Sequence, residues 1–163
     1  MTKLRPLAAL LLFALAACAS IAPRPAAPGW YVMRHLHKAE GADPALSEEG
    51  RRCAAILAEE LRGRGLAAIY VSTTRRARET AAPLAARTGL QPREYDPRDT
   101  AGLVERLRAE TGPVLVVGHS NTVPEIVERL GGARPGDIAD SRYGEIWFVA
   151  PGGAVTLRRI AGC

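Results

Sequence analysis

Residues 30–38 read WYVMRHLHK, and the rest of the chain is organised around this stretch. Its first half contains Tyr31, Val32 and Met33, an apolar run that predicts a short buried β-strand. Its second half, RHLHK, contains two positively charged residues and two histidines, directly after the apolar run. Because open α/β sheets bind their ligands at the carboxyl ends of strands, we expect a functional site here.

Two later stretches have the same design. Residues 114–120 read VLVVGHS, an apolar strand that ends at a glycine and is followed by His119. Residues 69–81 read IYVSTTRRARETA, a strand that runs into a helix with Arg76 near its start. Helix N-termini attract anions, and arginine adds a permanent charge suited to phosphate or carboxylate. The three junctions together therefore predict an anion site built from Arg34, His35, Arg76 and His119.

Taken in order, these junctions resemble the motifs of the histidine phosphatase superfamily, the phosphoglycerate-mutase-like fold. The matching residues are Arg34-His35, Ser72-x-x-x-Arg76-Ala-x-x-Thr80-Ala81 and Gly118-His119-Ser120. The resemblance covers nearly all of the chain beyond residue 29. It implies phosphomonoester hydrolysis in which His35 is the nucleophile and becomes a phosphohistidine. Arg34, Arg76 and His119 would bind the phosphoryl group of a small phosphorylated substrate, and neither a metal nor another cofactor is required.

The proton donor is less well defined by the resemblance. Many family members take an acid from the segment after the third strand, which makes Asp96 the first candidate catalytic acid. Asp99 lies in the same region, and Glu40 or His37 could substitute. Asp96 also precedes a proline, a pattern that is typical of a turn.

Two alternatives to this function stay open at the level of sequence. Leu36 stands where the commonest family motif has glycine, so the chain could be a low-activity or inactive lipoprotein that binds a phosphate ligand. Alternatively, His35 and His37 alternate as if in a strand and could form a zinc hydrolase site with His119. The nearby arginines Arg34 and Arg76 disfavour a bound dication.

The alternation of strands and helices predicts an α/β fold, a three-layer sandwich with a mostly parallel central sheet and helices on both faces. One domain spans residues 30–163. Helices are expected at residues 48–62, 76–87 and 101–110 and after His119, and strands at residues 67–71, 91–95 and 114–117. Residues 144–150 and 154–160 predict a C-terminal β-hairpin.

The first 29 residues are expected to serve export and attachment. Residues 1–17 have a basic start and an apolar run too short to span a bilayer, as in a signal peptide. They end at a sequence that resembles a bacterial lipobox, so Cys18 is the expected lipidation site. Residues 18–29 are rich in proline and alanine and predict a tether. The expected location is the outer membrane, facing the periplasm, with an ordinary cleaved signal peptide as the alternative.

Composition and cysteine usage add two further expectations. The net charge of +5 comes from scattered arginines, and only 5% of residues are aromatic, so nucleic acid is not an expected partner. Cys53 shares a helix face with apolar residues and is expected to be a small unpaired core residue. Export makes a Cys53–Cys163 disulfide chemically possible, but it is the less favoured alternative.

Overall fold

The protein was analysed as a computed structural model that describes residues 28–163. The predicted signal peptide, Cys18 and nearly all of the predicted tether lie outside the described residues. Within the described part, no helix is long and apolar enough to cross a membrane.

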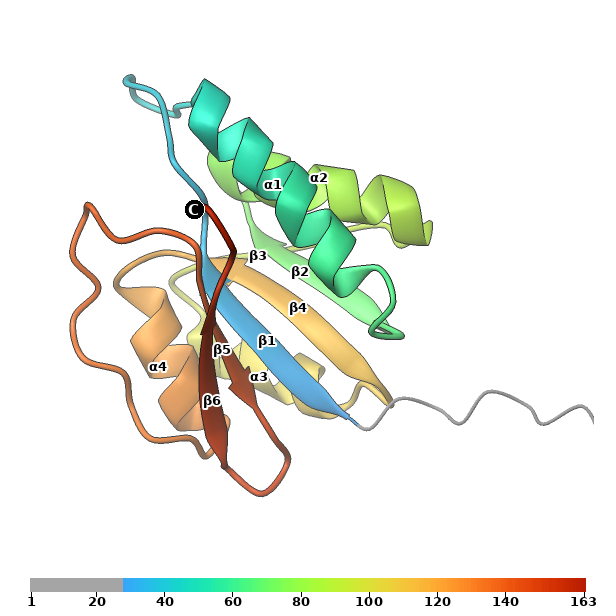
Figure 1. Ribbon diagram of the computed structural model, residues 1–163. Helices are drawn as coiled ribbons and strands as arrows, with labels where there is room; N and C mark the ends of the chain where they lie inside the picture. The colour runs from blue at the N-terminus through green and yellow to red at the C-terminus, as the bar shows by residue number, and fades with distance from the viewer. Residues whose placement is uncertain (1–27) are drawn as a thin grey trace, which may run out of the picture.

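A six-stranded sheet forms the middle layer of the molecule (Figure 1). Its strand order is β3-β2-β4-β1-β5-β6; the first four strands are parallel to one another, β5 is antiparallel to β1, and β6 is antiparallel to β5. The strands are β1 (Gly29–Arg34), β2 (Ala68–Ser72), β3 (Arg93–Tyr95), β4 (Pro113–Gly118), β5 (Glu145–Val149) and β6 (Val155–Arg159). This confirms the predicted mostly parallel sheet and its C-terminal hairpin.

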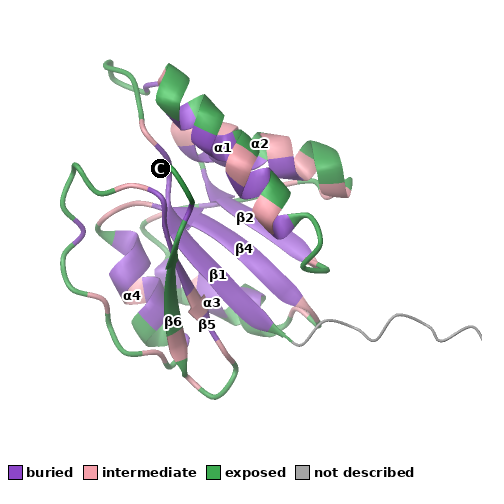
Figure 2. Ribbon diagram, viewed as in Figure 1, coloured by how far each residue is buried: buried purple, intermediate pink, exposed green. Residues whose placement is uncertain are grey.

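Four helices cover the sheet on both faces. They are α1 (Glu48–Leu61), α2 (Arg75–Thr88), α3 (Thr100–Arg108) and α4 (Thr122–Arg129). One buried cluster joins α1 and α2 to one face of the sheet, and a second joins α3 and α4 to the other face. In Figure 2 the helices are buried toward the sheet and exposed on the outside. The predicted three-layer sandwich is confirmed, and the observed helices lie within about two residues of the predicted ones.

The two central strands are the reason that the site can form. Every residue of β1 and β4 is buried, as expected for strands covered by helices on both faces. They pair in parallel register from Gly29 opposite Pro113 to Arg34 opposite Gly118, so both strands end at the same level. On the other side of β4, Val71 of β2 lies opposite Val117. The chain therefore leaves three neighbouring strands at one edge of the sheet.

The interpretation of Cys53 as an unpaired core residue is wrong. Cys53 of α1 forms a disulfide with Cys163; their Cα atoms lie 5.9 Å apart, and the two residues are separated by 110 positions in sequence. Cys53 is fully buried, so the apolar helix face was read correctly, but the same face also receives the C-terminal end of the chain. The disulfide fixes this end to α1.

We expect this disulfide to stabilise the domain substantially. Closing a loop of this length restricts the unfolded chain, and removal of such a bond typically costs about 2–4 kcal/mol. Urea unfolding of the Cys53→Ala/Cys163→Ala double variant should show that loss relative to the oxidised wild type. Reductant should lower the stability of the wild type and leave the double variant unchanged. Equal sensitivity of both proteins to reductant would contradict the assignment.

Candidate active site

The two predicted site histidines meet at the carboxyl ends of adjacent strands. His35 directly follows β1, and its backbone N–H donates to the carbonyl of Gly118, the last residue of β4, at 2.9 Å. His119 follows Gly118, and the ring centroids of the two histidines lie 5.3 Å apart. The register of β1 against β4 thus brings the first and third sequence motifs together.

The His35 ring is held as a neutral imidazole with a free lone pair. Its side chain is buried, and its Nδ1 lies 2.9 Å from the backbone carbonyl of Leu36. Because a carbonyl can only accept, Nδ1 must carry the proton, and the lone pair is on Nε2. Burial, with the positive charge of Arg34 and Arg76, lowers the pKa of His35 to about 3. The ring is therefore unprotonated at neutral pH.

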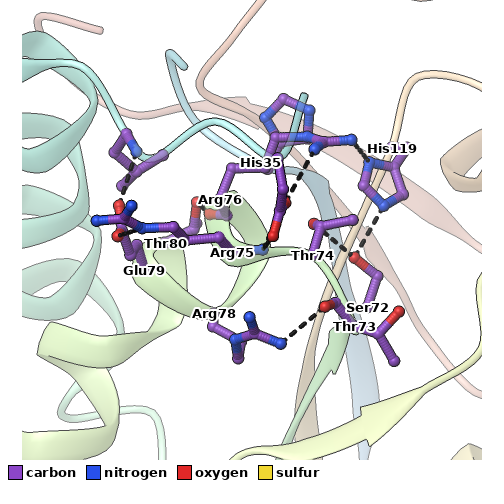
Figure 3. A network of polar contacts seen from close by, with 12 residues as sticks. His35, Ser72, Thr73, Thr74, Arg75, Arg76, Arg78, Glu79, Thr80 and His119 are labelled. Carbon is purple, nitrogen blue, oxygen red and sulfur yellow. Dashed lines mark hydrogen bonds and ion pairs between the residues drawn. The ribbon is translucent and has the colours of Figure 1, made fainter. Parts of the chain in front are cut away.

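His119 is fixed by partners from two other elements, as Figure 3 shows. Arg76 Nη2 lies 3.4 Å from His119 Nδ1, and His119 Nε2 lies 2.8 Å from the hydroxyl of Ser72. Since arginine only donates, Nδ1 accepts and Nε2 carries the proton that is donated to Ser72. Burial, with the charge of Arg76, lowers the pKa of His119 to about 4. His119 is thus neutral and oriented.

Arg76 lies in the first turn of α2, where the second motif placed it. Its Nη1 lies 3.7 Å from Asp43, while its buried Nε has no hydrogen-bond acceptor among the described residues. Thr80, one turn later, ties this helix to the loop that follows His35. Its hydroxyl donates to the carbonyl of Arg76 at 2.8 Å and accepts from the N–H of Leu36 at 3.0 Å. The bond fixes Arg76 relative to His35.

Arg34 reaches across to the segment between α4 and β5. Its Nη1 donates to the carbonyls of Ala139, Asp140 and Arg142 at 3.0–3.2 Å, and its guanidinium lies 4.4 Å from the ring centroid of Tyr143. Its Nε is buried without an acceptor in the described part of the chain, like that of Arg76.

These contacts place an unprotonated imidazole beside two guanidinium groups. An unsatisfied buried donor costs about 1–3 kcal/mol, and arginine is suited to binding the oxygens of a phosphate-like group. The two free Nε–H groups therefore favour an oxyanion near His35, His119 and Ser72. The structure brings together Arg34, His35, Arg76 and His119, all of which the sequence singled out.

Asp96 is placed differently from these four residues. Its carboxylate is exposed and accepts hydrogen bonds from the backbone and the side chain of Arg98. These bonds hold the pKa of Asp96 below its usual value, so the group stays ionised. No hydrogen bond or ion pair of the described residues joins it to the histidines. Asp99, the other candidate in this region, caps α3 by accepting from the N–H of Gly102, and Glu40 is exposed.

The three-histidine zinc alternative is not supported by the geometry. It assumed that the strand continues to His37, but β1 ends at Arg34, and the chain then turns toward α1. The His37 ring stacks on Tyr143 and faces Glu49 rather than His119. Within residues 28–163, no three His, Cys, Asp or Glu side chains lie close enough together to hold a metal ion.

Leu36 does not narrow the site. Its side chain is fully buried in the core cluster beneath α1 and α2, together with Leu46. His35 and His37 lie on either side of it in sequence, so Leu36 anchors the turn that carries both rings. The Leu36 side chain therefore takes no space beside the His35 ring, and its effect on activity stays a prediction.

Sequence reasoning missed the roles of Ser72, Thr80 and Tyr143. Ser72 and Thr80 were part of the quoted motif, and their spacing from Arg76 could have suggested hydrogen bonds to the neighbouring junctions. Tyr143 gave no such signal, because it lies in an irregular segment far along the chain. Its ring centroid is 4.2 Å from that of His37 and 6.1 Å from that of His35.

The fold and the site together define a class of protein, an α/β sandwich whose strand ends hold a buried imidazole between two arginines. The model of the histidine phosphatase superfamily (branch 1) matches residues 32–98, which include the first two motifs. The chain is therefore similar to this superfamily over less than half of its length, and the match does not extend to His119. A search of curated protein sequences found no match.

Solved structures share the fold at low sequence identity. The protein histidine phosphatase SixA in complex with tungstate is 20% identical with a TM-score of 0.60. A mycobacterial glucosyl-3-phosphoglycerate phosphatase in complex with inorganic phosphate is 20% identical with a TM-score of 0.63. A phosphoserine phosphatase from Entamoeba histolytica in complex with 3-phosphoglyceric acid is 14% identical with a TM-score of 0.61. Each alignment covers 80% of this chain and 94% of the other.

We expect inorganic oxyanions to bind at this site through Arg76. Tungstate should raise the melting temperature of the wild-type protein, because a ligand that binds only the folded state stabilises it. Arg76→Ala should weaken tungstate binding roughly 10- to 100-fold, since a charged hydrogen bond contributes about 1.5–3 kcal/mol. Arg78→Ala is the matched control, because Arg78 lies on the same helix but is half-exposed and paired with Glu94. Equal losses in both variants would argue against the site.

Proposed function

We propose that this protein hydrolyses phosphomonoesters through a covalent phosphohistidine on His35. One observation carries the proposal: the lone pair of a buried neutral imidazole lies beside two arginines whose Nε–H groups are buried without acceptors. A phosphoryl group bound by Arg34 and Arg76 would meet the Nε2 atom of His35. Covalent catalysis divides the hydrolysis into two easier displacements.

The residues around His35 would stabilise the charge that develops during transfer. Phosphoryl transfer depends mainly on positioning and on fixed positive groups around the phosphoryl oxygens. Arg34 and Arg76 supply two such groups, and both are held by other contacts before any ligand binds. His119 is neutral in this arrangement and is oriented by Ser72 to line the same site.

The ligands of related structures support a small phosphorylated substrate. The neighbours were solved with tungstate, inorganic phosphate and 3-phosphoglyceric acid, each an oxyanion or a phosphate ester. The proposed chemistry uses only side chains of this chain, so it needs neither a metal nor another cofactor. A chelator should therefore leave the rate unchanged.

The test is phosphate release from an aryl phosphate by the domain that begins near Pro28. His35→Ala should reduce the rate by more than roughly 10³-fold, because it removes the nucleophile. In the wild type, the pKa of His35 near 3 keeps the ring unprotonated down to acidic pH, so protonation of the nucleophile should not reduce the rate above about pH 4. Acid quench during turnover should trap a phosphorylated wild-type protein and none in the variant. Undiminished turnover by His35→Ala would contradict the proposal.

We also propose that the protein is exported and anchored to the outer membrane by a lipid on Cys18, facing the periplasm. The sequence of residues 1–18 carries this proposal. The Cys53–Cys163 disulfide supports export, because disulfides persist in oxidising compartments. The proline-rich residues that follow Cys18 would separate the domain from the membrane.

Lipidation should be visible in detergent partitioning of the full chain. The wild-type protein should enter the detergent phase and incorporate labelled fatty acid, whereas Cys18→Ala should do neither. Ser20→Ala is the matched control, because it changes a small neighbouring residue and keeps the cysteine. A wild-type protein that stays in the aqueous phase without label would favour an ordinary cleaved signal peptide.

A further inference from the structure

The proposed hydrolysis requires a proton for the departing oxygen, and the predicted donor does not supply it. Asp96 is exposed, ionised and bound to Arg98. His119 is neutral, and its single ring proton is already donated to Ser72. Neither group is therefore a suitable acid. This inference rests on the proposed function and concerns the same site.

His37 is the remaining histidine, and it borders the same aromatic ring as the nucleophile. The ring centroid of Tyr143 lies 4.2 Å from that of His37 and 6.1 Å from that of His35. The intervening Leu36 is anchored in the core, so the positions of both histidines depend on one fixed turn. The Tyr143 ring therefore lies beside both imidazoles.

The backbone of His37 is held rigidly against the start of α1. Its carbonyl accepts hydrogen bonds from both the N–H and the hydroxyl of Ser47, at 2.9 Å and 3.3 Å. Gly50 passes directly beneath, and a Cβ there would collide with the carbonyl oxygen of His37. The ring thus projects from a packed scaffold, which suits a group that must be positioned for proton transfer.

The two ring nitrogens of His37 have different surroundings. Nε2 lies 3.7 Å from a carboxylate oxygen of Glu49. Nδ1 is buried and has no hydrogen-bond partner among the described residues. The groups that contact this ring are Glu49 of α1 and Tyr143; Arg52 pairs with Glu49, and Arg34 lies over the Tyr143 ring. Nδ1 is therefore the nitrogen left for a ligand.

We propose that His37 is the general acid and base of the reaction, acting through Nδ1, with Glu49 as its positioning residue. In the first displacement, the bond between His35 Nε2 and phosphorus forms, and the bond from phosphorus to the ester oxygen breaks. The Nδ1 proton of His37 passes to that oxygen, which leaves as an alcohol. In the second, a water oxygen bonds to phosphorus, the nitrogen–phosphorus bond breaks, and a water proton returns to His37.

The test compares two substrates that differ in how much they need an acid. A nitrophenyl phosphate has a stable leaving group, whereas a simple alkyl phosphate such as glycerol phosphate needs protonation as it leaves. His37→Gln should lower kcat for the alkyl phosphate by about 10²-fold or more and should lower it far less for the nitrophenyl phosphate. Turnover of the nitrophenyl phosphate also shows that the variant is folded.

A second pair of variants tests the role of Glu49. Glu49→Gln removes the carboxylate beside Nε2 of His37, so kcat for the alkyl phosphate should fall while its KM and the turnover of the nitrophenyl phosphate change little. Glu48→Gln is the matched control, since Glu48 is the exposed neighbour in the same helical turn and should leave kcat for both substrates unchanged. An unchanged kcat for the alkyl phosphate in Glu49→Gln would overturn the role of Glu49.

Other outcomes would overturn the assignment of His37 itself. Equal losses on both substrates in His37→Gln would mean that the ring positions substrate without donating a proton. A loss confined to the alkyl phosphate in Tyr143→Phe but absent in His37→Gln would assign the acid to the tyrosine hydroxyl. A wild-type protein that hydrolyses neither substrate would overturn the proposed function and, with it, this role.

Discussion

The site depends on the close approach of two strand ends, where the N–H of His35 donates to the carbonyl of Gly118 at 2.9 Å. This approach requires glycine, because a Cβ at position 118 would lie 2.7 Å from the hydroxyl oxygen of Thr122 and 2.9 Å from that of Tyr95. Thr122 in turn accepts a hydrogen bond from the N–H of His119 at 2.9 Å. A side chain at residue 118 would displace the turn that orients the second histidine. The apolar strands therefore determine where the two histidines lie along the sheet, and Gly118 allows the close approach between them.

Hydroxyl groups help to hold the three junctions together. Ser72 joins the end of β2 to His119, and Thr80 joins α2 to the turn after His35. Both side chains are fully buried, so each hydrogen bond is protected from water and costly to lose. This explains the spacing of the second motif, because Thr80 lies one helical turn after Arg76 and accepts the N–H of Leu36. The arginine is oriented by its own helix.

Local pattern predicted much of this fold, since buried parallel strands and one-sided helices leave periodic apolar residues in the sequence. It also predicted which strand ends would meet, because parallel strands align their carboxyl ends. The errors involve contacts between residues far apart in the chain. The Cys53–Cys163 bond joins residues separated by 110 positions, and Tyr143 reaches the site from an irregular segment. The expectation that His35 and His37 alternate in a strand was wrong. β1 ends at Arg34, and the side chain of Leu36 is buried in the segment that follows.

Arg34 differs from the arginines that pair with Glu145 in the kind of partner it has. This difference decides where positive charge is left without a buried carboxylate. Arg142 and Arg159 both pair with Glu145, whose side chain is only 3% exposed, so that carboxylate offsets their charge. The Arg34 side chain is only 5% exposed, but its partners are mainly backbone carbonyls. Its acidic partner among the described residues, Asp140, is 94% exposed. An exposed ion pair contributes little in water, so it offsets little of the guanidinium charge. Carbonyls fix the direction of the group without neutralising it. Because no buried acid within residues 28–163 pairs with Arg34, its charge remains available to an anion beside His35. The same contacts make the segment around Asp140 part of the wall of the site.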